Sequence, residues 1–298
     1  MIYIIVLNWN GWQDTLECLE SLLKLEFANY RVIVCDNYSQ DDSEERIGQW
    51  LKQLPAEQSA RFTLLQTGEN RGYGPGNNVG IRLALQDPLM EAVWILNNDV
   101  VVDSRSLHAL YQYHLDNPKR GLIGSKLMFY TSPTQIQAVG GQYNRFFASS
   151  THLGEFEIDH GQYDQDEIST QIDYPVGAAL FVTRAYLESV GLLAEEYFLY
   201  FEEIDWATRG ALAGWQLGYC YQSRVFHKEG GSTGANANPV LKSYLSDYYS
   251  VINRVRFTRK FYRANLWSVK LGLLIAGANR IRRGQFDRLK IIFKALAS

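Results

Sequence analysis

Three consecutive polar residues, Asn97, Asn98 and Asp99, are the strongest candidates for chemistry in this chain. They separate two short apolar runs, at 92–96 and 100–102, and an apolar run that stops at polar residues is typical of a buried strand ending at a site. A carboxylate at such a strand end can bind a hard cation, and oxygen ligands suit Mg²⁺ or Mn²⁺. The alternative for these residues alone is a turn capped by Asn and Asp.

A cluster of acids and a late histidine provide a second set of reactive groups. Glu202, Glu203 and Asp205 lie near the predicted start of a helix, where acids also complement the helix dipole. Crowding of like charges raises a carboxyl pKa toward neutral pH, as a general base requires. His227 precedes a Gly-Gly pair, and it is either an ordinary structural residue or one that closes over a metal or a diphosphate. Together the two sets predict a metal-dependent transferase site.

Nucleotide-binding groups are predicted in two further loops. Asp36 ends the apolar run 32–35 and either accepts hydrogen bonds from a base or ribose or serves as a turn residue. Residues 70–78 contain three glycines, three asparagines and Arg71, a composition that lets a phosphate approach the backbone and the N-terminus of the following helix. Their glycine spacing differs from the dinucleotide-binding fingerprint, and the sequence has no Walker-type phosphate loop. These patterns argue against a Rossmann-type oxidoreductase.

Alternating strands and helices must position these residues. The expected strands are 2–7, 31–35, 62–66 and 93–96, and the expected helices are 12–25, 42–54, 73–86 and 104–115. Later segments are expected to form strands within 121–141 and 171–183 and at 217–226, an exposed acidic loop at 159–173, a helix at 201–213 and helices after 240. This order predicts an α/β fold with a mainly parallel sheet and a site at the carboxyl ends of its strands.

The composition is globular and the cysteines are those of a reduced protein. The chain has 298 residues, of which 46% are hydrophobic and 20% charged, so it can form one large α/β domain with an appendage or two domains. Its three cysteines are scattered, without metal-ligand spacing, which predicts free thiols and a cytoplasmic protein. The apolar run 2–7 is too short for a signal peptide and is expected to be the first strand.

The charge is strongly asymmetric. Residues 254–298 hold 12 Lys and Arg against one acid, a net charge of +11, while the rest of the chain carries −14. Residues 264–278 are mostly apolar but are shorter than the about 20 residues that span a bilayer. A basic tail with interfacial aromatic residues predicts peripheral binding to an anionic membrane at the inner face of the plasma membrane. The alternative is a helical hairpin that packs on the body, whereas the acidic body argues against nucleic acid.

Taken in order, the motifs resemble those of the family-2 glycosyltransferases with the GT-A fold. The matching segments lie within residues 2–235 and are Asn8-Trp9-Asn10-Gly11, Cys35-Asp36-Asn37, Glu69-Asn70-Arg71-Gly72-Tyr73-Gly74, Leu96-Asn97-Asn98-Asp99, Gly177-Ala178-Ala179, Phe201-Glu202-Glu203-Ile204-Asp205 and His227. Within this family the chain looks most similar to the bacterial rhamnosyltransferase-like branch.

This resemblance implies both an architecture and a reaction. It implies an α/β/α sandwich at 1–238, with a donor-binding part at 1–103 and an acceptor part at 104–238, followed by a basic amphipathic helical region at 239–298. The reaction would be an inverting, Mg²⁺- or Mn²⁺-dependent transfer from a nucleotide-diphosphate sugar, either dTDP-rhamnose or a UDP-sugar. The acceptor would be a glycan or a polyprenyl-linked glycan of cell-surface polysaccharide synthesis.

The resemblance also assigns roles to individual residues. Asp99 and His227 would approach the metal, and Glu203 takes the position of the general base, where the family usually has Asp. Because the longer Glu side chain changes its reach, Asp205 and Glu202 remain alternative catalytic residues. The donor-binding candidates are Asn8, Asn10, Asp36, Asn70, Arg71, Gly72, Asn77, Asn97 and Asn98, and the acceptor-binding candidates are Gly177, Ala178 and Trp206.

Two other functions stay open on the sequence. A nucleotidyltransferase would share the strand-end acid and a nucleotide pocket, but the acids and the histidine after residue 200 favour glycosyl transfer. A non-catalytic sugar-nucleotide-binding or scaffold protein is suggested by Glu203, since Asp is usual at that position. Measuring donor hydrolysis or transfer would separate the second alternative from an enzyme.

Overall fold

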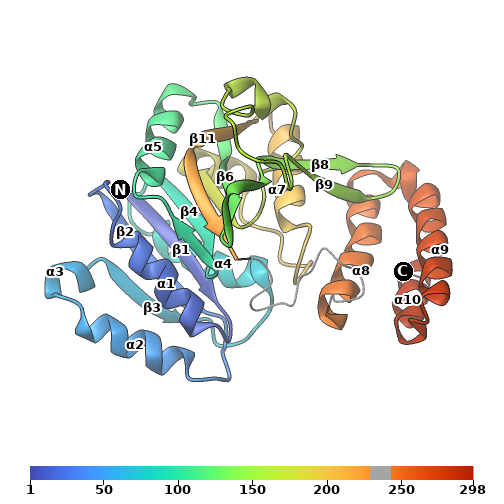
Figure 1. Ribbon diagram of the computed structural model, residues 1–298, viewed down its shortest axis with the longest axis horizontal. Coiled ribbons are helices and arrows are strands. Elements are labelled where there is room, and N and C mark those ends of the chain that lie inside the picture. Colours follow the sequence, from blue (N-terminus) through green and yellow to red (C-terminus); the bar gives the residue numbers. More distant parts are fainter. Residues whose placement is uncertain (229–242, 298) are drawn as a thin grey trace.

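A computed structural model describes residues 1–228 and 243–297, which form an α/β body and a group of C-terminal helices (Figure 1). Within the described residues the main sheet has nine strands, in the order β3-β2-β1-β4-β10-β6-β11-β5, with β7 beside β6. These strands are β1 (Ile2–Asn8), β2 (Tyr30–Asp36), β3 (Phe62–Gln66), β4 (Ala92–Asn97), β5 (Val100–Val102), β6 (Arg120–Phe129), β7 (Ser132–Ala138), β10 (Ala179–Thr183) and β11 (Gln216–His227). A separate hairpin consists of β8 (Gly140–Asn144) and β9 (Ser149–Leu153).

Helices cover both faces of the sheet. They are α1 (Trp12–Leu22), α2 (Ser43–Gln53), α3 (Ala56–Ser59), α4 (Tyr73–Ala84), α5 (Ser106–Asp116), α6 (Arg184–Val190) and α7 (Glu202–Leu212). Alternate residues of β1 face opposite sides, so that Ile4 packs in a core with α1, α2 and α5, and Ile5 packs in a core with α4, α6 and α7. Because both faces are buried, the strand reads as a continuous apolar run. The predicted α/β/α sandwich is confirmed.

Parallel pairing brings the predicted strand-end residues together. Strands β1, β2, β3 and β4 are parallel neighbours, whereas β10 runs antiparallel to β4 and β6. In this register Asn8 pairs with Asp36, and Leu7 pairs with Asn97. The predicted mainly parallel arrangement of this part of the sheet is confirmed, and it places two of the predicted polar loops at one edge.

The predicted exposed acidic loop at 159–173 is wrong in part. The Asp159 carboxylate accepts hydrogen bonds from the fully buried Lys126 ammonium at 2.9 and 3.0 Å, and Asp164 pairs with the same group. A buried ammonium needs such partners, so Asp159 turns inward, whereas Asp166, Glu167 and Asp173 are exposed as predicted. A 3₁₀ turn follows at Asp166–Thr170 and packs Ile168 into a small core. The strand predicted within 171–183 begins only at Ala179.

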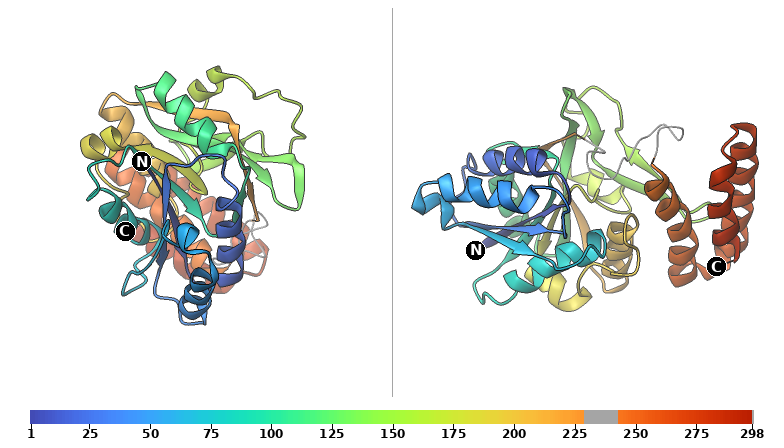
Figure 2. Two further views of the ribbon diagram at one scale, coloured as in Figure 1. Left: turned by 90° about the vertical axis from the view of Figure 1, so that its left-hand side faces the viewer. Right: turned by 90° about the horizontal axis from the view of Figure 1, so that it is seen from below.

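Three helices end the chain: α8 (Tyr244–Phe261), α9 (Leu266–Arg282) and α10 (Leu289–Ala297). The first packs on the body, since Phe257 lies in the core beneath α7 and the Asn253 amide donates to three carbonyls of the 197–200 loop. The other two pack on α8 and on each other through a third core, at one end of the molecule (Figure 2). The predicted boundary at 238/239 lies outside the described residues. No helix in the described part of the chain is long and apolar enough to cross a bilayer.

Arg280 is a structural residue that joins α9 to α8. Its guanidinium donates to Asp247 at 2.7 Å and to the Arg288 carbonyl at 2.9 Å, and its side chain is almost fully buried. We expect Arg280→Gln to lower the free energy of unfolding by about 3 kcal/mol. The substitution removes one of the two positive charges that pair with the buried Asp247 carboxylate. Urea denaturation would measure this, with the exposed Arg282→Gln as a control that changes stability by less than about 0.5 kcal/mol. Equal effects of the two substitutions would contradict this role.

Candidate functional site

A cavity of about 280 Å³ opens at the carboxyl ends of β1 and β4. Loops around residues 70–73, 176–178 and 198–203 form its walls, and the start of α8 completes it. Ten of the predicted site residues line this cavity: Asn70, Gly72, Asn97, Asn98, Asp99, Gly177, Ala178, Glu202, Glu203 and His227. Segments from the whole length of the body therefore meet at one place.

The backbone of the 198–201 loop positions the acids at the start of α7. Phe198, Tyr200 and Phe201 have φ angles of 67°, 69° and 79°, in the left-handed region, where each such residue costs about 1–3 kcal/mol. Contacts with Gly72 hold the loop: a Cβ on Gly72 would lie 2.2 Å from the Phe198 carbonyl oxygen. The N–H of Tyr73 donates to that same oxygen at 2.7 Å. Glycine at position 72 is thus required by the close approach of two loops.

Asp99 and His227 face each other across neighbouring strands. His227 Nε2 lies 3.1 Å from Asp99 Oδ1, and both side chains are almost fully buried. The other ring nitrogen, Nδ1, lies 2.8 Å from Gln137 Oε1. An amide oxygen accepts hydrogen bonds, so this contact favours a proton on Nδ1 and directs the Nε2 lone pair toward Asp99. The pairing of β11 with β5 fixes this approach, since His227 pairs with Val100.

This pair fits a divalent cation bound together with a phosphate-bearing ligand. No group of three or more His, Cys, Asp or Glu side chains in the described part of the chain is arranged to hold a metal by itself. Asp99 supplies one carboxylate and His227 one imidazole nitrogen, a donor set that suits Mn²⁺ and is compatible with Mg²⁺. Such cations commonly use one or two protein ligands and complete their coordination with water and substrate phosphates.

Glu202 and Glu203 are adjacent carboxyls with raised pKa values. Burial raises the pKa of Glu203 to about 7. Burial, together with the charge of Glu203, raises the pKa of Glu202 well above its ordinary value. Glu202 is buried, and its Oε1 has no hydrogen-bond partner among the described residues. At neutral pH the arrangement therefore favours a protonated Glu202 and a half-buried Glu203 that can take up a proton.

Asp205 and Trp206 lie in the core rather than at the cavity. The Asp205 carboxylate accepts from Arg209 at 2.6 Å, Tyr197 at 2.9 Å and Lys260 at 2.6 Å, so it ties α7 to α8. Residues 203 and 205 point to opposite sides of a helix with 3.6 residues per turn. The indole N–H of Trp206 donates to the Gly191 carbonyl at 2.8 Å, and its ring is fully buried. We therefore leave both residues out of the proposed site.

The remaining predicted donor-binding residues lie around the cavity without lining it. Asn8 and Asp36 are buried and joined by a hydrogen bond of 2.6 Å. Asn10 is exposed, with its Oδ1 accepting from the Gln40 N–H, and Arg71 is exposed beside Glu69 and Glu195. Asn77 is buried within α4 and donates to the Tyr73 carbonyl, so we leave it out of the proposed site as well.

Several cavity residues were not predicted as site residues. They include Trp9, Asn37, Tyr73, His152, Val176, Phe198, Leu199, Tyr200 and Leu245. Tyr73 donates from its hydroxyl to the Gly177 carbonyl at 2.6 Å and so links two walls of the cavity. The aromatic run before Glu202 was a usable signal for Phe198 and Tyr200. His152 lies on the β8–β9 hairpin in a segment without clear periodicity, and burial followed by the charge of His227 lowers its pKa.

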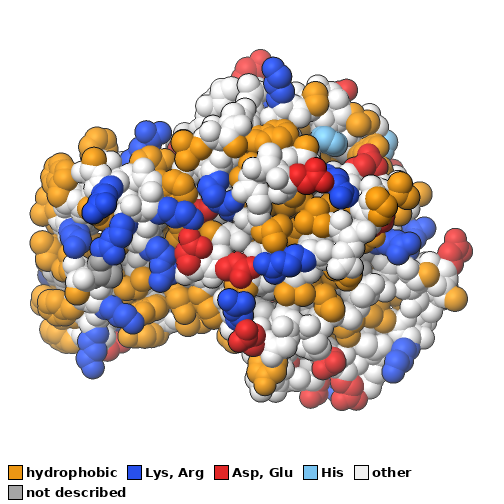
Figure 3. Space-filling view, turned by 180° about the vertical axis from the view of Figure 1, so that it is seen from behind, with side chains coloured by type: hydrophobic (Ala, Val, Ile, Leu, Met, Phe, Trp, Pro, Cys, Tyr) orange, Lys and Arg blue, Asp and Glu red, His pale blue; other side chains and the backbone are white. Residues whose placement is uncertain are grey.

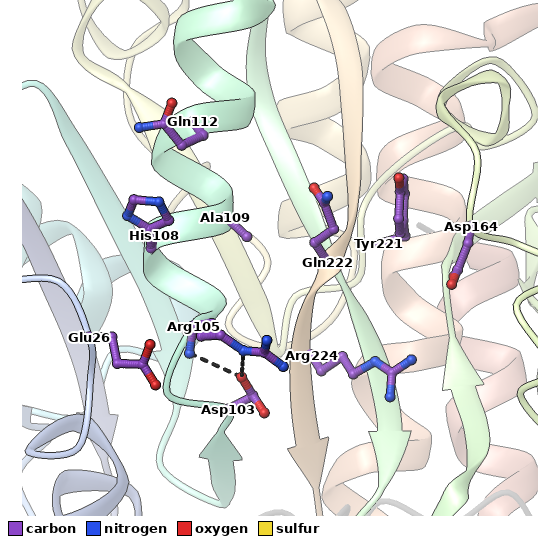
Figure 4. Close-up of a pocket in the computed structure, with 10 residues that line it drawn as sticks. All are labelled: Glu26, Asp103, Arg105, His108, Ala109, Gln112, Asp164, Tyr221, Gln222 and Arg224. Carbon is purple, nitrogen blue, oxygen red and sulfur yellow. Dashed lines mark hydrogen bonds and ion pairs between the residues drawn. The ribbon is translucent and has the colours of Figure 1, made fainter.

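A larger cavity of about 760 Å³ lies elsewhere, between α5 and β11 (Figure 4). Its charged lining mixes both signs, and Arg105 pairs with Asp103 at 3.8 Å. It contains none of the predicted site residues and neither of the two glutamates with raised pKa values. The chemistry of the side chains therefore places the candidate site in the smaller cavity.

Comparisons with known proteins identify the family. The model of Glycosyl transferase family 2 matches residues 3–189. An N-acetylglucosaminyl-diphospho-decaprenol L-rhamnosyltransferase of Mycobacterium tuberculosis is 24% identical over 294 residues, covering 91% of this chain and 92% of that protein. The low-salt glycan biosynthesis hexosyltransferase Agl10 of Haloferax volcanii is 24% identical over 230 residues. That match covers 76% of this chain but only 66% of the archaeal protein.

Solved structures show the same fold at low sequence identity. A mannosyltransferase of Pyrobaculum calidifontis in complex with GDP-Man and Mn²⁺ has a TM-score of 0.61 at 14% identity, covering 99% of this chain and 85% of that one. The structure of GalNAc-T7 with UDP, GalNAc and Mn²⁺ has a TM-score of 0.66 at 13% identity. The match covers 89% of this chain and 49% of that one. Since the family model matches more than half of the residues, the chain belongs to glycosyl transferase family 2 and has the GT-A fold.

Proposed function

We propose that this protein transfers a sugar from a nucleotide-diphosphate donor to a hydroxyl of a glycan or lipid-linked glycan, with inversion at the anomeric carbon. The observation that carries the proposal is the presence of two groups in one cavity: Glu203, with a pKa of about 7, and the Asp99–His227 pair. The first suits proton removal from an acceptor hydroxyl, and the second suits a cation on a diphosphate. A single displacement needs both groups at one site.

The metal-binding pair and the two glutamates then have distinct tasks. A bound Mg²⁺ or Mn²⁺, held by Asp99 and His227, would neutralise charge that develops on the diphosphate leaving group. A carboxylate oxygen of Glu203 takes the proton of the acceptor hydroxyl as that oxygen attacks the anomeric carbon from the face opposite the diphosphate. Glu202 remains protonated, which avoids a second negative charge beside the base. Gln137 keeps the His227 ring in one orientation.

The relatives support particular substrates. The mycobacterial relative is named for L-rhamnosyl transfer to a diphospho-decaprenol-linked sugar, and the archaeal relative for glycan biosynthesis. We therefore propose dTDP-rhamnose as the donor, with a UDP-sugar as the alternative, and a polyprenyl-linked glycan of cell-surface polysaccharide synthesis as the acceptor. Because such an acceptor is held in a bilayer, we place the reaction at the inner face of the plasma membrane.

The buried Asp36 gives a prediction for nucleotide binding. Its carboxylate accepts from Asn8 and Ser39 at 2.6 Å and from the Gln66 amide at 2.8 Å. Gln66 is exposed and can give up its place to an N–H of the nucleobase. We expect Asp36→Asn to weaken nucleotide binding about 10- to 100-fold, because the amide cannot accept these bonds on both atoms. Calorimetric titration should show little loss of nucleotide affinity for Gln66→Ala. A larger loss for Gln66→Ala than for Asp36→Asn would refute the role of Asp36 in nucleotide binding.

Product analysis tests the proposed reaction as a whole. The protein would be incubated with Mn²⁺, a candidate donor and a polyprenyl-diphosphate N-acetylglucosamine acceptor, and the new linkage would be assigned by NMR. The proposal predicts a product with the opposite anomeric configuration to the donor. Pyrophosphate release from a nucleoside triphosphate and a sugar phosphate would instead indicate a nucleotidyltransferase. Donor binding without hydrolysis or transfer would indicate a non-catalytic binding protein.

A further inference from the structure

One side of α9 is apolar and exposed to solvent. Its exposed side chains, here called the apolar face of α9, are Trp267, Leu271, Leu274, Ile275 and Ile281. This spacing places them on one side of the helix, and Val269 and Leu273 on the opposite side pack into the third core. Trp267 is 68% exposed, and no element of the described chain covers this face. A single helix that is apolar on both sides is unusual for a surface helix of a monomeric protein.

The tip of the β8–β9 hairpin extends this surface. Phe146 and Phe147 at the tip are exposed, at 60% and 50%. The backbone of Gly272 in α9 lies close to the Phe147 ring, since a Cβ on that glycine would lie 3.4 Å from Phe147 Cδ1. The following residue, Ala148, packs in the core of the C-terminal helices. Figure 1 shows the hairpin reaching α9, so two elements far apart in sequence form one apolar border.

Some cations of the tail form ion pairs within the fold. Arg280 and Arg288 pair with Asp247, and Lys260 pairs with Asp205 and Glu196, so these three stabilise the fold. Although it belongs to the basic tail, Arg280 is therefore not available to an anionic membrane. Arg263, Arg282 and Arg283 are exposed at the two ends of α9, and Lys290 is exposed on α10, which packs against α9.

Acids do not balance these exposed cations. Asp287 is the single acid among residues 254–298. Figure 3 shows Lys and Arg side chains interspersed with hydrophobic ones over the C-terminal helices, at the left of that view. The surface thus combines an apolar strip with positive charge, the combination that suits a bilayer with anionic headgroups.

We propose that the apolar face of α9 and the hairpin tip lie in the interface of a bilayer that contains anionic lipid, with Arg282, Arg283 and Lys290 on the headgroups. The 17 residues of α9 are fewer than the about 20 that span a bilayer, and the exposed Arg282 and Arg283 lie at the C-terminal end of the helix, so we place the helix in the membrane plane rather than across it. A second copy of this chain fits the surface less well. A two-fold interface pairs a patch with itself, so the cations of the two copies would lie close together and repel each other.

Vesicle co-sedimentation tests the proposal with the full chain. Vesicles of phosphatidylcholine alone would be compared with vesicles that also contain the anionic lipid phosphatidylglycerol, whose negative surface potential attracts a polybasic surface. Wild-type protein should bind the anionic vesicles more strongly, and added salt should weaken that binding. The triple variant Leu271→Gln, Leu274→Gln, Ile275→Gln should partition at least about tenfold less. The variant Arg282→Glu, Arg283→Glu should lose its preference for anionic lipid.

Two controls keep the result interpretable. Leu212→Gln removes a leucine on α7 that is even more exposed than Leu271 and Leu274, and this variant should bind as wild type does. Thermal unfolding should be unchanged in all variants, because each replaced side chain is exposed.

A second measurement uses brominated lipids, which quench tryptophan fluorescence in the bilayer interface. Trp267→Phe should remove most of the quenching that vesicles cause in the wild-type protein.

Three results would overturn the proposal. The first is absence of wild-type binding to either vesicle. The second is equal binding by the triple variant and the wild type, or quenching that survives Trp267→Phe. The third is a concentration-dependent dimer, seen by sedimentation velocity without lipid, that the triple variant abolishes while vesicle binding is absent. That last result would assign the surface to a second copy of the chain.

Discussion

Replacing Glu203 by Gln is expected to reduce the turnover of sugar transfer by about 10²- to 10⁴-fold while leaving donor affinity unchanged. The substitution is nearly isosteric, and it removes the carboxylate that accepts the proton of the attacking hydroxyl. Turnover would be measured by release of the nucleoside diphosphate with saturating acceptor, and donor affinity by calorimetric titration. A Glu203→Gln enzyme with wild-type turnover would remove this residue from the mechanism.

The pH dependence of the wild-type enzyme follows from the same group. Burial raises the pKa of Glu203 to about 7, so the rate should rise with pH through about 7 as the base loses its proton. Stability should change in the opposite direction. Because the native state holds protons on Glu202 and Glu203 that the unfolded chain releases near its ordinary pKa of 4.5, this pair's contribution is fully present below that pH and is lost as pH rises through about 7. Glu203→Gln should weaken both dependences.

Asp205→Asn is the matched control for this experiment. It removes one charge two residues away on the same helix, from a buried carboxylate that Arg209 and Lys260 hold. We expect a loss of stability of about 3–5 kcal/mol, since Arg209 and Lys260 lose the buried negative charge that they share. Urea denaturation of both variants would separate the roles. A stable Asp205→Asn protein without turnover, beside an active Glu203→Gln protein, would make Asp205 the base.

Asp99→Asn is expected to abolish the part of donor affinity that depends on Mn²⁺. The amide keeps the shape of the side chain but removes the negative charge beside His227 Nε2, and carboxylate oxygen is the stronger ligand for Mg²⁺ and Mn²⁺. Calorimetric titration of the nucleoside diphosphate with Mn²⁺ and with a chelator would measure the difference. Wild-type protein should lose affinity on chelation, whereas the variant should bind equally weakly in both conditions.

Gln137→Leu provides a graded comparison for Asp99→Asn. The amide oxygen of Gln137 holds His227 Nδ1 at 2.8 Å, so its removal should leave the ligands in place but free the ring to rotate. Loss of such an orienting partner typically costs 10- to 100-fold in metal affinity. Affinity for Mn²⁺ that is unchanged in both variants would show that the cation does not bind at this pair.

The sequence predicted well what depends on local pattern. The apolar runs at 2–7 and 93–96 form buried strands, because a continuous run of apolar residues bounded by turn residues has few other ways to be buried. The predicted strand at 62–66 also forms, but it lies at the edge of the sheet and is only partly buried. Asn97, Asp99 and Glu203 line one cavity because the carboxyl end of β4 and the start of α7 lie on the same side of the fold. The motif order was therefore enough to identify the fold, and the site residues that it suggests stay a prediction.

Residues whose position depends on packing between distant elements could not be predicted in this way. Asp205 and Trp206 follow Glu203 closely in sequence, yet α8 turns Asp205 into a buried ion pair and the core takes up the Trp206 ring. In the sequence Arg280 cannot be distinguished from its exposed neighbour Arg282, whereas in the structure it is buried and pairs with Asp247 of α8. His152 reaches the cavity from a hairpin whose sequence carries no clear period. In each case the partner comes from another part of the chain.

The most direct test of a metal-dependent nucleotide-sugar site at this cavity is thermal unfolding with a panel of nucleotide sugars, each with Mn²⁺ and with a chelator. Selective binding to the native state raises the melting temperature. We expect at least one nucleotide sugar to raise the melting temperature in the presence of Mn²⁺, equally for wild type and Glu203→Gln. The Asp99→Asn protein should show no such rise. A panel without effect on the wild type, or an equal rise in Asp99→Asn and in chelator, would contradict our account.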